Sequence, residues 1–191
     1  MPQSQKRPMG VIPRRALCLS APVFPAGGRR AQGLRIVPDA RVAIGISVTR
    51  DTLSLSAADL CLRELARRAL PVAALSGSGS AGALADAVES FIDEISLDRG
   101  RLLGVGIAAS GLWDISPEEL TCAFSCPVRL ENPGSASGRA ECFVRGGSRN
   151  MAFLSLDHGI SGAVLMDGEL CAGDSGRCGT FGHICVEPGV S

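Results

Sequence analysis

The first half of the chain alternates strand-like and helix-like patterns, and this alternation limits the fold more than any other feature. VAIGISV (residues 42–48) and TLSLSAA (52–58) are predicted to be two strands joined by a short turn. After SGSGSAG (76–82), where Ser80 is a candidate cap, apolar residues recur every three or four positions and predict an amphipathic helix. RLLGVGIAAS (101–110) is a continuous apolar run, which we expect to be a parallel strand buried on both faces. The order indicates an α/β fold.

The same signals predict the rest of the chain. Pro117 is expected at the first position of a helix, and Asp167-Gly168 at the turn of a hairpin. The other expected elements are strands at 69–75, 126–132, 151–156 and 161–170, a turn at 131–138 and a short helix at 139–144. We therefore divide the chain into a leader and linker (1–41), a first unit (42–147) and the beginning of a second unit (148–191).

Charge is distributed unevenly along the sequence. Residues 1–41 contain eight Lys or Arg and one acid, so this segment carries +7 and the remainder −7. A basic Pro- and Arg-rich arm can contact an anionic partner such as DNA, or it can be a solvated, disordered leader, which is the simpler interpretation. It shows no helix pair typical of a helix-turn-helix, so DNA contact would be weak or would need another module.

Seven glycines lie between Gly159 and Gly182. In Asp157–Gly162 a glycine turn after a strand could direct backbone N–H groups at a phosphate, or it could be a plain hairpin turn. The lysine of a Walker loop and the helix of a dinucleotide fingerprint are both missing. Asp157 would also repel a phosphate at this place.

The remaining composition narrows the class of protein. No apolar run is long enough for a membrane span or a signal-peptide core, so we expect a cytoplasmic protein without membrane contact. The eight cysteines are scattered and are expected to be buried hydrophobes rather than disulfides.

The spacing of the whole glycine-rich stretch is more specific than any single loop. Leu156, Gly159, Gly162-Ala163, Gly173, Gly179 and Gly182-His183 together resemble the signature of the ROK family of sugar kinases and sugar-responsive repressors. GRRAQGLRIVPDARVAIGIS (28–47) resembles the entry to the effector domain of its repressors. LLGVGIAASGLWD (102–114) and PVRLENPGSASGRAECFVRGGSRNMAFLSL (127–156) resemble its sugar-loop and catalytic segments. The resemblance implies an actin-like ATPase (ribonuclease-H-like) fold, with the first lobe largely present and the second truncated.

The departures from the family pattern concern its chemistry. In the kinases an Asp directly after Glu-Asn accepts the proton of the sugar hydroxyl, and here that position is Pro133. The first phosphate loop is replaced by Ser47-Val48-Thr49-Arg50-Asp51, Ser161 stands where the second loop has glycine, and a sugar-binding Glu is Thr180. We therefore expect no catalytic residue, no ATP or Mg²⁺ requirement and a vestigial phosphate loop at Gly159, Ile160, Ser161 and Gly162.

The resemblance still implies a sugar site. Its candidate residues are Asn132, Glu131, His183 and Gly111. In the family this histidine binds sugar or joins a downstream cysteine cluster around zinc. The given sequence contains no such cluster after His183, so we expect an incomplete zinc site and a His183 that is structural or contacts sugar weakly.

Three functions remain open at this point. The leading hypothesis is a non-catalytic sugar-sensing domain of a transcriptional regulator without its own helix-turn-helix. The alternatives are an ATP-dependent kinase of hexoses or N-acetylhexosamines, and an interaction fragment without ligand. Because the strands at 151–156 and 161–166 lack later helices to cover them, we also expect exposed apolar faces, which a homo-oligomer could bury.

Overall fold

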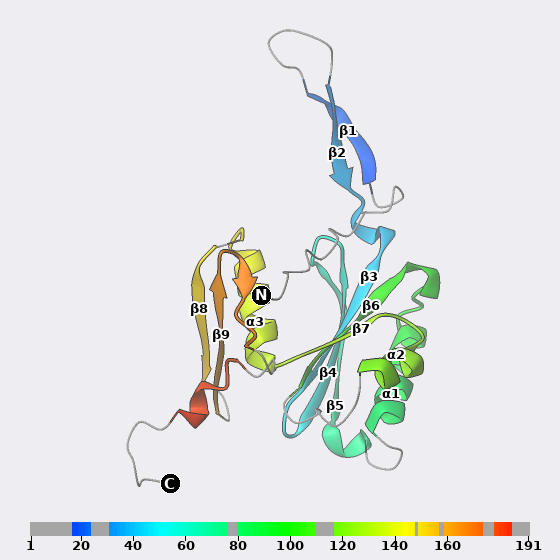
Figure 1. The fold of residues 1–191 in the computed structure, drawn as a ribbon. Coiled ribbons are helices and arrows are strands. Elements are labelled where there is room, and N and C mark those ends of the chain that lie inside the picture. The colour runs from blue at the N-terminus through cyan, green and yellow to red at the C-terminus, as the bar shows by residue number, and fades with distance from the viewer. Residues whose placement is uncertain are drawn as a thin grey trace.

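The structure is a computed structural model that describes residues 17–23, 31–75, 80–109, 117–147, 149–156, 159–173 and 178–184 (Figure 1). Its strands form a hairpin, a five-stranded sheet and a three-stranded sheet. The elements of the five-stranded part are β3 (Val42–Val48), β4 (Thr52–Asp59), β5 (Glu64–Pro71), α1 (Ser80–Glu94), β6 (Leu102–Ala109), α2 (Pro117–Phe124) and β7 (Val128–Glu131).

The five-stranded sheet has the order β5-β4-β3-β6-β7. β3 pairs antiparallel with β4 and parallel with β6, and β6 is parallel to β7, as expected from the strand–helix–strand pattern. Helices α1 and α2 cover one face of this sheet (Figure 1). The core between them is apolar because alternate strand residues such as Ile44, Leu55 and Ile107 meet Phe91 and Leu120 of the helices.

Two predictions for this sheet were wrong. β6 is buried on one face only, since Leu103 is 51% exposed and Gly106 is also exposed. The third strand runs over residues 64–71 rather than 69–75. Pro71 ends the strand because it has no N–H to donate a hydrogen bond to a neighbouring strand. The residues that follow, Val72–Leu75, form a 3₁₀ turn.

The second sheet has the order β10-β9-β8, formed by β8 (Met151–Leu156), β9 (Ile160–Met166) and β10 (Glu169–Leu170). The Asp167-Gly168 turn was predicted correctly: both residues have positive φ (52° and 82°), as a type I′ hairpin turn requires. Helix α3 (Pro133–Val144) packs on β8 and β9 (Figure 1). The domain boundary expected at residue 147 stays a prediction. Helix α3 precedes that boundary in the sequence but packs on the second sheet.

Helix α3 begins six residues before the helix expected from the sequence. ENPGSASG was interpreted as a turn because of its Pro, Gly and Ser content. Asn132 caps the helix and Pro133 occupies its first turn, where a missing N–H costs nothing. Because α3 contains two glycines, which disfavour a helix, its formation depends on the Asn132 cap and on packing against the sheet.

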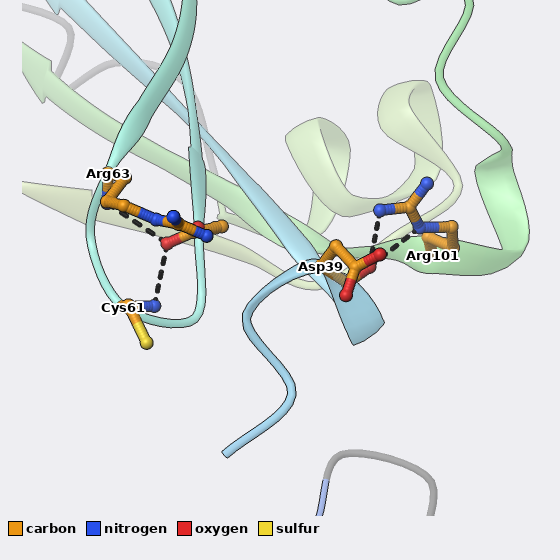
Figure 2. Close-up of polar contacts among 5 residues, drawn as sticks. Asp39, Cys61, Arg63 and Arg101 are labelled. Atoms are coloured by element: carbon orange, nitrogen blue, oxygen red, sulfur yellow. Dashed lines mark hydrogen bonds and ion pairs between the residues drawn. The ribbon is translucent and has the colours of Figure 1, made fainter. Parts of the chain in front are cut away.

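Two groups of polar contacts lie at one end of the five-stranded sheet, where β4 ends and β3 and β6 begin (Figure 2). In the β4–β5 turn the buried Asp59 carboxylate accepts hydrogen bonds from the Cys61 N–H (2.8 Å), the Arg63 N–H (3.0 Å) and the Arg63 Nε–H (2.7 Å). Burial raises the pKa of Asp59, but these bonds and the Arg63 charge outweigh it, and the net effect lowers the pKa. At the start of β3 and β6, the Arg101 Nε–H donates to the Asp39 carbonyl oxygen at 2.9 Å.

The arm is not wholly a disordered leader. Residues Leu17–Val23 (β1) and Ala31–Ile36 (β2) pair as an antiparallel hairpin that projects away from the rest of the molecule (Figure 1). Alternating apolar residues such as those of LCLSAPV favour a strand once a partner strand is available. The expectation of a fully unstructured segment was therefore wrong over these residues.

Cysteine burial was predicted only in part. Cys142 is buried against the second sheet, but Cys61 and Cys122 are exposed. Burial raises the pKa of the Cys126 thiol. Cys61, Cys122, Cys126, Cys171 and Cys178 are free thiols. Across the described ranges, no helix is both long and apolar enough to span a bilayer.

Candidate functional site

The candidate site is built around the junction of β7 and α3. β7 is a parallel strand, and ligands of open α/β sheets bind beyond the carboxyl ends of such strands. The chain leaves β7 at Glu131 and enters α3 through Asn132, which is only 6% exposed. The Asn132 Oδ1 accepts a hydrogen bond from the Gly134 N–H at 2.8 Å, so this side chain fixes the first turn of the helix.

Glu131, the second predicted sugar contact at this junction, is hydrogen-bonded to Arg129 and forms a longer ion pair with Arg139. Its Oε1 accepts hydrogen bonds from the Arg129 Nε–H (2.8 Å) and lies 3.4 Å from the Arg139 Nε. The Glu131 side chain is 20% exposed, so the guanidinium groups of β7 and α3 replace most of its water. Planar guanidinium groups are the strongest partners of a carboxylate in proteins.

Three glycines bring the helix and the second sheet into backbone contact next to this junction. A Cβ on Gly134 would lie 2.5 Å from the Gly162 nitrogen, and a Cβ on Gly179 would lie 2.1 Å from the Gly162 oxygen. The Gly162 N–H donates to the Gly179 carbonyl at 2.8 Å. We call these three residues, Gly134, Gly162 and Gly179, the glycine contact. Its glycines are needed because no side chain fits between the backbones.

The glycine-rich loop predicted to be a vestigial phosphate site lies beside this contact. Leu156 pairs with Ile160 across a hairpin, Gly159 is exposed, and Ser161 pairs with Ser155 in the ladder. Gly162 is buried, and a Cβ there would lie 2.1 Å from the Phe153 oxygen. Packing and hairpin geometry thus account for Gly162 without a phosphate, and the vestigial loop stays a prediction.

The other predicted site residues are placed only in part. The backbone of His183 closes the 3₁₀ turn Phe181–His183, which packs on β9 near Ile160, and its side chain is not among those described. Gly111 lies outside the described residues, as do Asp157 and His158. The described part of the chain contains no group of three His, Cys, Asp or Glu able to hold a metal ion.

The structure therefore connects Asn132 through Gly134 to the contact with Gly162, and it adds residues that were not predicted. Gly134 and Gly138 were assigned to a turn, although a Cβ on Gly138 would lie 2.4 Å from the Ala163 Cβ. The four-residue spacing of these glycines indicates a helix face against a close neighbour. Arg129 and Arg139 gave no signal, because nothing in the sequence pairs them with Glu131.

Comparisons with known proteins show which family the chain resembles. Residues 113–190 match the ROK family. The chain is 26% identical over 185 residues to the DNA-binding transcriptional dual regulator NagC of Escherichia coli, which covers 85% of this chain and 45% of that protein. It is 27% identical over 163 residues to the N-acetylmannosamine kinase of Salmonella arizonae, covering 77% of this chain and 54% of the kinase.

Solved structures share the same fold. A ROK family transcriptional regulator, described as a homolog of the E. coli MLC protein, matches with a TM-score of 0.72 and 20% identity over 85% of this chain and 46% of that one. The ROK hexokinase from Thermus thermophilus matches with a TM-score of 0.61 and 25% identity, covering 78% and 54%. The chain spans about half the length of the relatives it matches.

Proposed function

We propose that this chain, which matches the ROK family over residues 113–190 and shares the fold of ROK structures, is a sugar-binding domain of a transcriptional regulator that does not phosphorylate its ligand. Family membership supports carbohydrate recognition, since the relatives are regulators and sugar kinases. The absence of catalysis is argued from the β7–α3 junction.

The observation that carries the proposal is Pro133 at the start of α3. A kinase needs a carboxylate that accepts the proton of the attacking hydroxyl. Pro133 follows the buried Asn132 directly and has no group that can accept a proton. The neighbouring carboxylate, Glu131, is already engaged in ion pairs with Arg129 (2.7 Å) and Arg139 (3.4 Å), so its charge is partly neutralised where it lies.

Asn132 supports binding without chemistry. Its Oδ1 caps α3, but the amide N–H groups can still donate to a sugar hydroxyl, and an amide does not titrate, so it can hold a sugar without activating it. The assignment to a regulator rests on the matches to NagC and to the regulator structure, each over 85% of the chain. We further propose that DNA contact, if this chain has it, uses the basic arm or a separate module, and that no ATP, Mg²⁺ or zinc is required.

The test combines ligand binding with turnover. A sugar that binds only the folded state must raise the melting temperature, so hexoses and N-acetylhexosamines should stabilise the chain in a thermal-shift screen. The same sugars with ATP and Mg²⁺ should release no ADP above background. Metal-dependent phosphorylation by the unmodified chain would contradict the proposal and favour the kinase, which the N-acetylmannosamine kinase match supports. No stabilisation by any sugar would favour a fragment without ligand.

A matched pair of variants tests the role of position 133. Pro133→Asp restores a carboxylate at the helix start, where an acid is tolerated because it interacts favourably with the helix dipole. Pro133→Asn changes the same position without adding a base. ADP release by the Asp variant alone would show that a proton acceptor is the missing component; equal release by the unmodified chain would contradict the proposal.

A further inference from the structure

The short segment that joins the β1–β2 hairpin to the five-stranded sheet is held by hydrogen bonds. Strand β2 ends at Ile36 and β3 begins at Val42, with the 3₁₀ turn Pro38–Ala40 between them. A flexible linker leaves its carbonyl groups to water. Here the carbonyl groups of residues 37–40 all accept hydrogen bonds from the protein. We call residues 37–41 the joint.

Two of these hydrogen bonds come from different parts of the sheet. The Leu60 N–H, in the β4–β5 turn, donates to the Pro38 carbonyl oxygen at 2.9 Å. The Arg101 guanidinium, just before β6, donates its Nε–H to the Asp39 carbonyl oxygen at 2.9 Å and an Nη2–H to the same oxygen (Figure 2). Because β4 and β6 are the two neighbours of β3, these bonds hold the joint from both sides of the strand that it enters.

The joint also donates to the turn that holds it. The Arg41 Nη1–H donates to the Gly100 carbonyl oxygen at 3.0 Å, so the segments before β3 and before β6 exchange arginine–carbonyl hydrogen bonds. The Asp98 side chain fixes this turn by accepting from the Gly100 N–H at 2.9 Å. In the described part of the chain neither Arg41 nor Arg101 forms an ion pair, so no carboxylate competes with the carbonyls for these guanidinium groups. Hydrogen bonds from a charged donor are stronger than those between neutral groups.

We propose that the joint is a lock that makes the β1–β2 hairpin and the five-stranded sheet move as one body, and that Arg101 is the positioning residue that keeps it closed. The proposal concerns the direction of the hairpin and does not rest on the proposed sugar site. Pro38 contributes because its ring fixes φ within the joint. A locked joint carries a rotation of the sheet to the hairpin and to a partner bound there, whereas a flexible linker would absorb it.

The turn before β6 offers a matched control for Arg101. Arg99 and Arg101 both belong to the 3₁₀ turn Arg99–Arg101. Arg101 reaches the joint, whereas the Arg99 Nη1–H donates to the Glu89 carboxylate of α1 at 2.7 Å. Replacing Arg99 therefore removes one guanidinium group from the same turn without removing a bond to the joint.

The first measurement is hydrogen exchange on the full chain. Exchange of the Leu60 N–H reports opening of the joint, because its acceptor is the Pro38 carbonyl oxygen. Exchange of the Val105 N–H, which is bonded inside the sheet, reports opening of the sheet itself. In Arg101→Ala the Leu60 amide should exchange about tenfold faster, and the Val105 amide should be unchanged. Arg99→Ala should change neither.

The second measurement is NMR relaxation of the backbone amides, which reports motion of the hairpin relative to the sheet. In the unmodified chain the amides of β1 and β2 should show the same rotational correlation time as those of the five-stranded sheet. In Arg101→Ala they should show a shorter one. Arg101→Lys keeps the charge but loses the planar pair of donors, so it should give a smaller change in the same direction.

Three results would overturn the proposal. The first is a hairpin that tumbles independently of the sheet in the unmodified chain. The second is an Arg101→Ala variant that leaves Leu60 exchange unchanged, or that speeds Leu60 and Val105 equally, because the arginine would then contribute only general stability. The third is an equal effect of Arg99→Ala. If Arg101→Ala does not fold, Arg101→Lys decides: faster Leu60 exchange than in Arg99→Ala supports the lock, and equal exchange overturns it.

Discussion

The two sheets of this molecule begin with the same three-strand meander but are held together in different ways. In the first sheet, large apolar side chains fill the space under α1 and α2: Phe91, Leu53, Leu55 and Ile44 are at most 2% exposed. In the second, the buried cluster is small, formed by Cys142, Ala163 and Leu165 with partly buried neighbours. There α3 approaches the strands through glycines rather than through interdigitated side chains.

The difference teaches where each part of the molecule is sensitive to substitution. A core of large side chains loses stability when volume is removed, because a cavity remains. A backbone contact through glycine loses stability when volume is added, because the backbones must separate. The candidate sugar site lies at the second kind of contact, so its geometry depends on the absence of side chains as much as on Asn132.

The largest effect is expected in the first core. Phe91→Ala should lower the free energy of unfolding by about 3–5 kcal/mol, whereas Leu165→Ala in the smaller cluster should cost about 2 kcal/mol. Urea denaturation followed by circular dichroism measures both. Equal losses of stability would show that the second cluster is as well packed as the first and would contradict the proposed difference between the two cores.

A smaller loss of stability, caused by adding volume rather than removing it, is expected at the glycine contact. Gly134→Ala puts a Cβ 2.5 Å from the Gly162 nitrogen and should cost about 1–3 kcal/mol. Gly82→Ala, on helix α1 with open space around it, is the matched control and should stabilise by about 0.4–1 kcal/mol. If both alanines stabilise, the close approach of α3 to β9 is incorrect. The Gly134 variant should also lose any thermal stabilisation by sugar.

The smallest effect concerns the rim of the first sheet and depends on pH. The folded-state pKa of Asp59 lies below its unfolded value of about 3.9, so its bonds stabilise the fold fully above that pH. This contribution is lost as the pH falls through the folded pKa. Asp59→Asn should therefore narrow the difference in stability between pH 7 and pH 3. An unchanged pH profile would show that the β4–β5 turn does not depend on the ionised carboxylate.

Sequence reasoning located most strands because side-chain alternation is a local property. The strands at residues 42–48, 52–58 and 151–156 were predicted correctly. The hairpin turn was predicted from the dipeptide Asp167-Gly168 alone. It failed where a distant partner overrides local preference. The first two turns of α3 have the composition of a loop, and they are helical because Asn132 caps them and β9 accepts their glycines.

Some features of the chain that bear on the candidate site follow from the sequence, and others follow only from the tertiary structure. Proline at position 133 and the +7 arm are properties of the sequence alone, because they depend only on which residue occupies a position. The approach of Arg139 to Glu131 and the meeting of Gly134 with Gly162 were decided by the tertiary structure. These contacts join residues far apart along the chain or on different elements, and only the packing of those elements sets the distances between them.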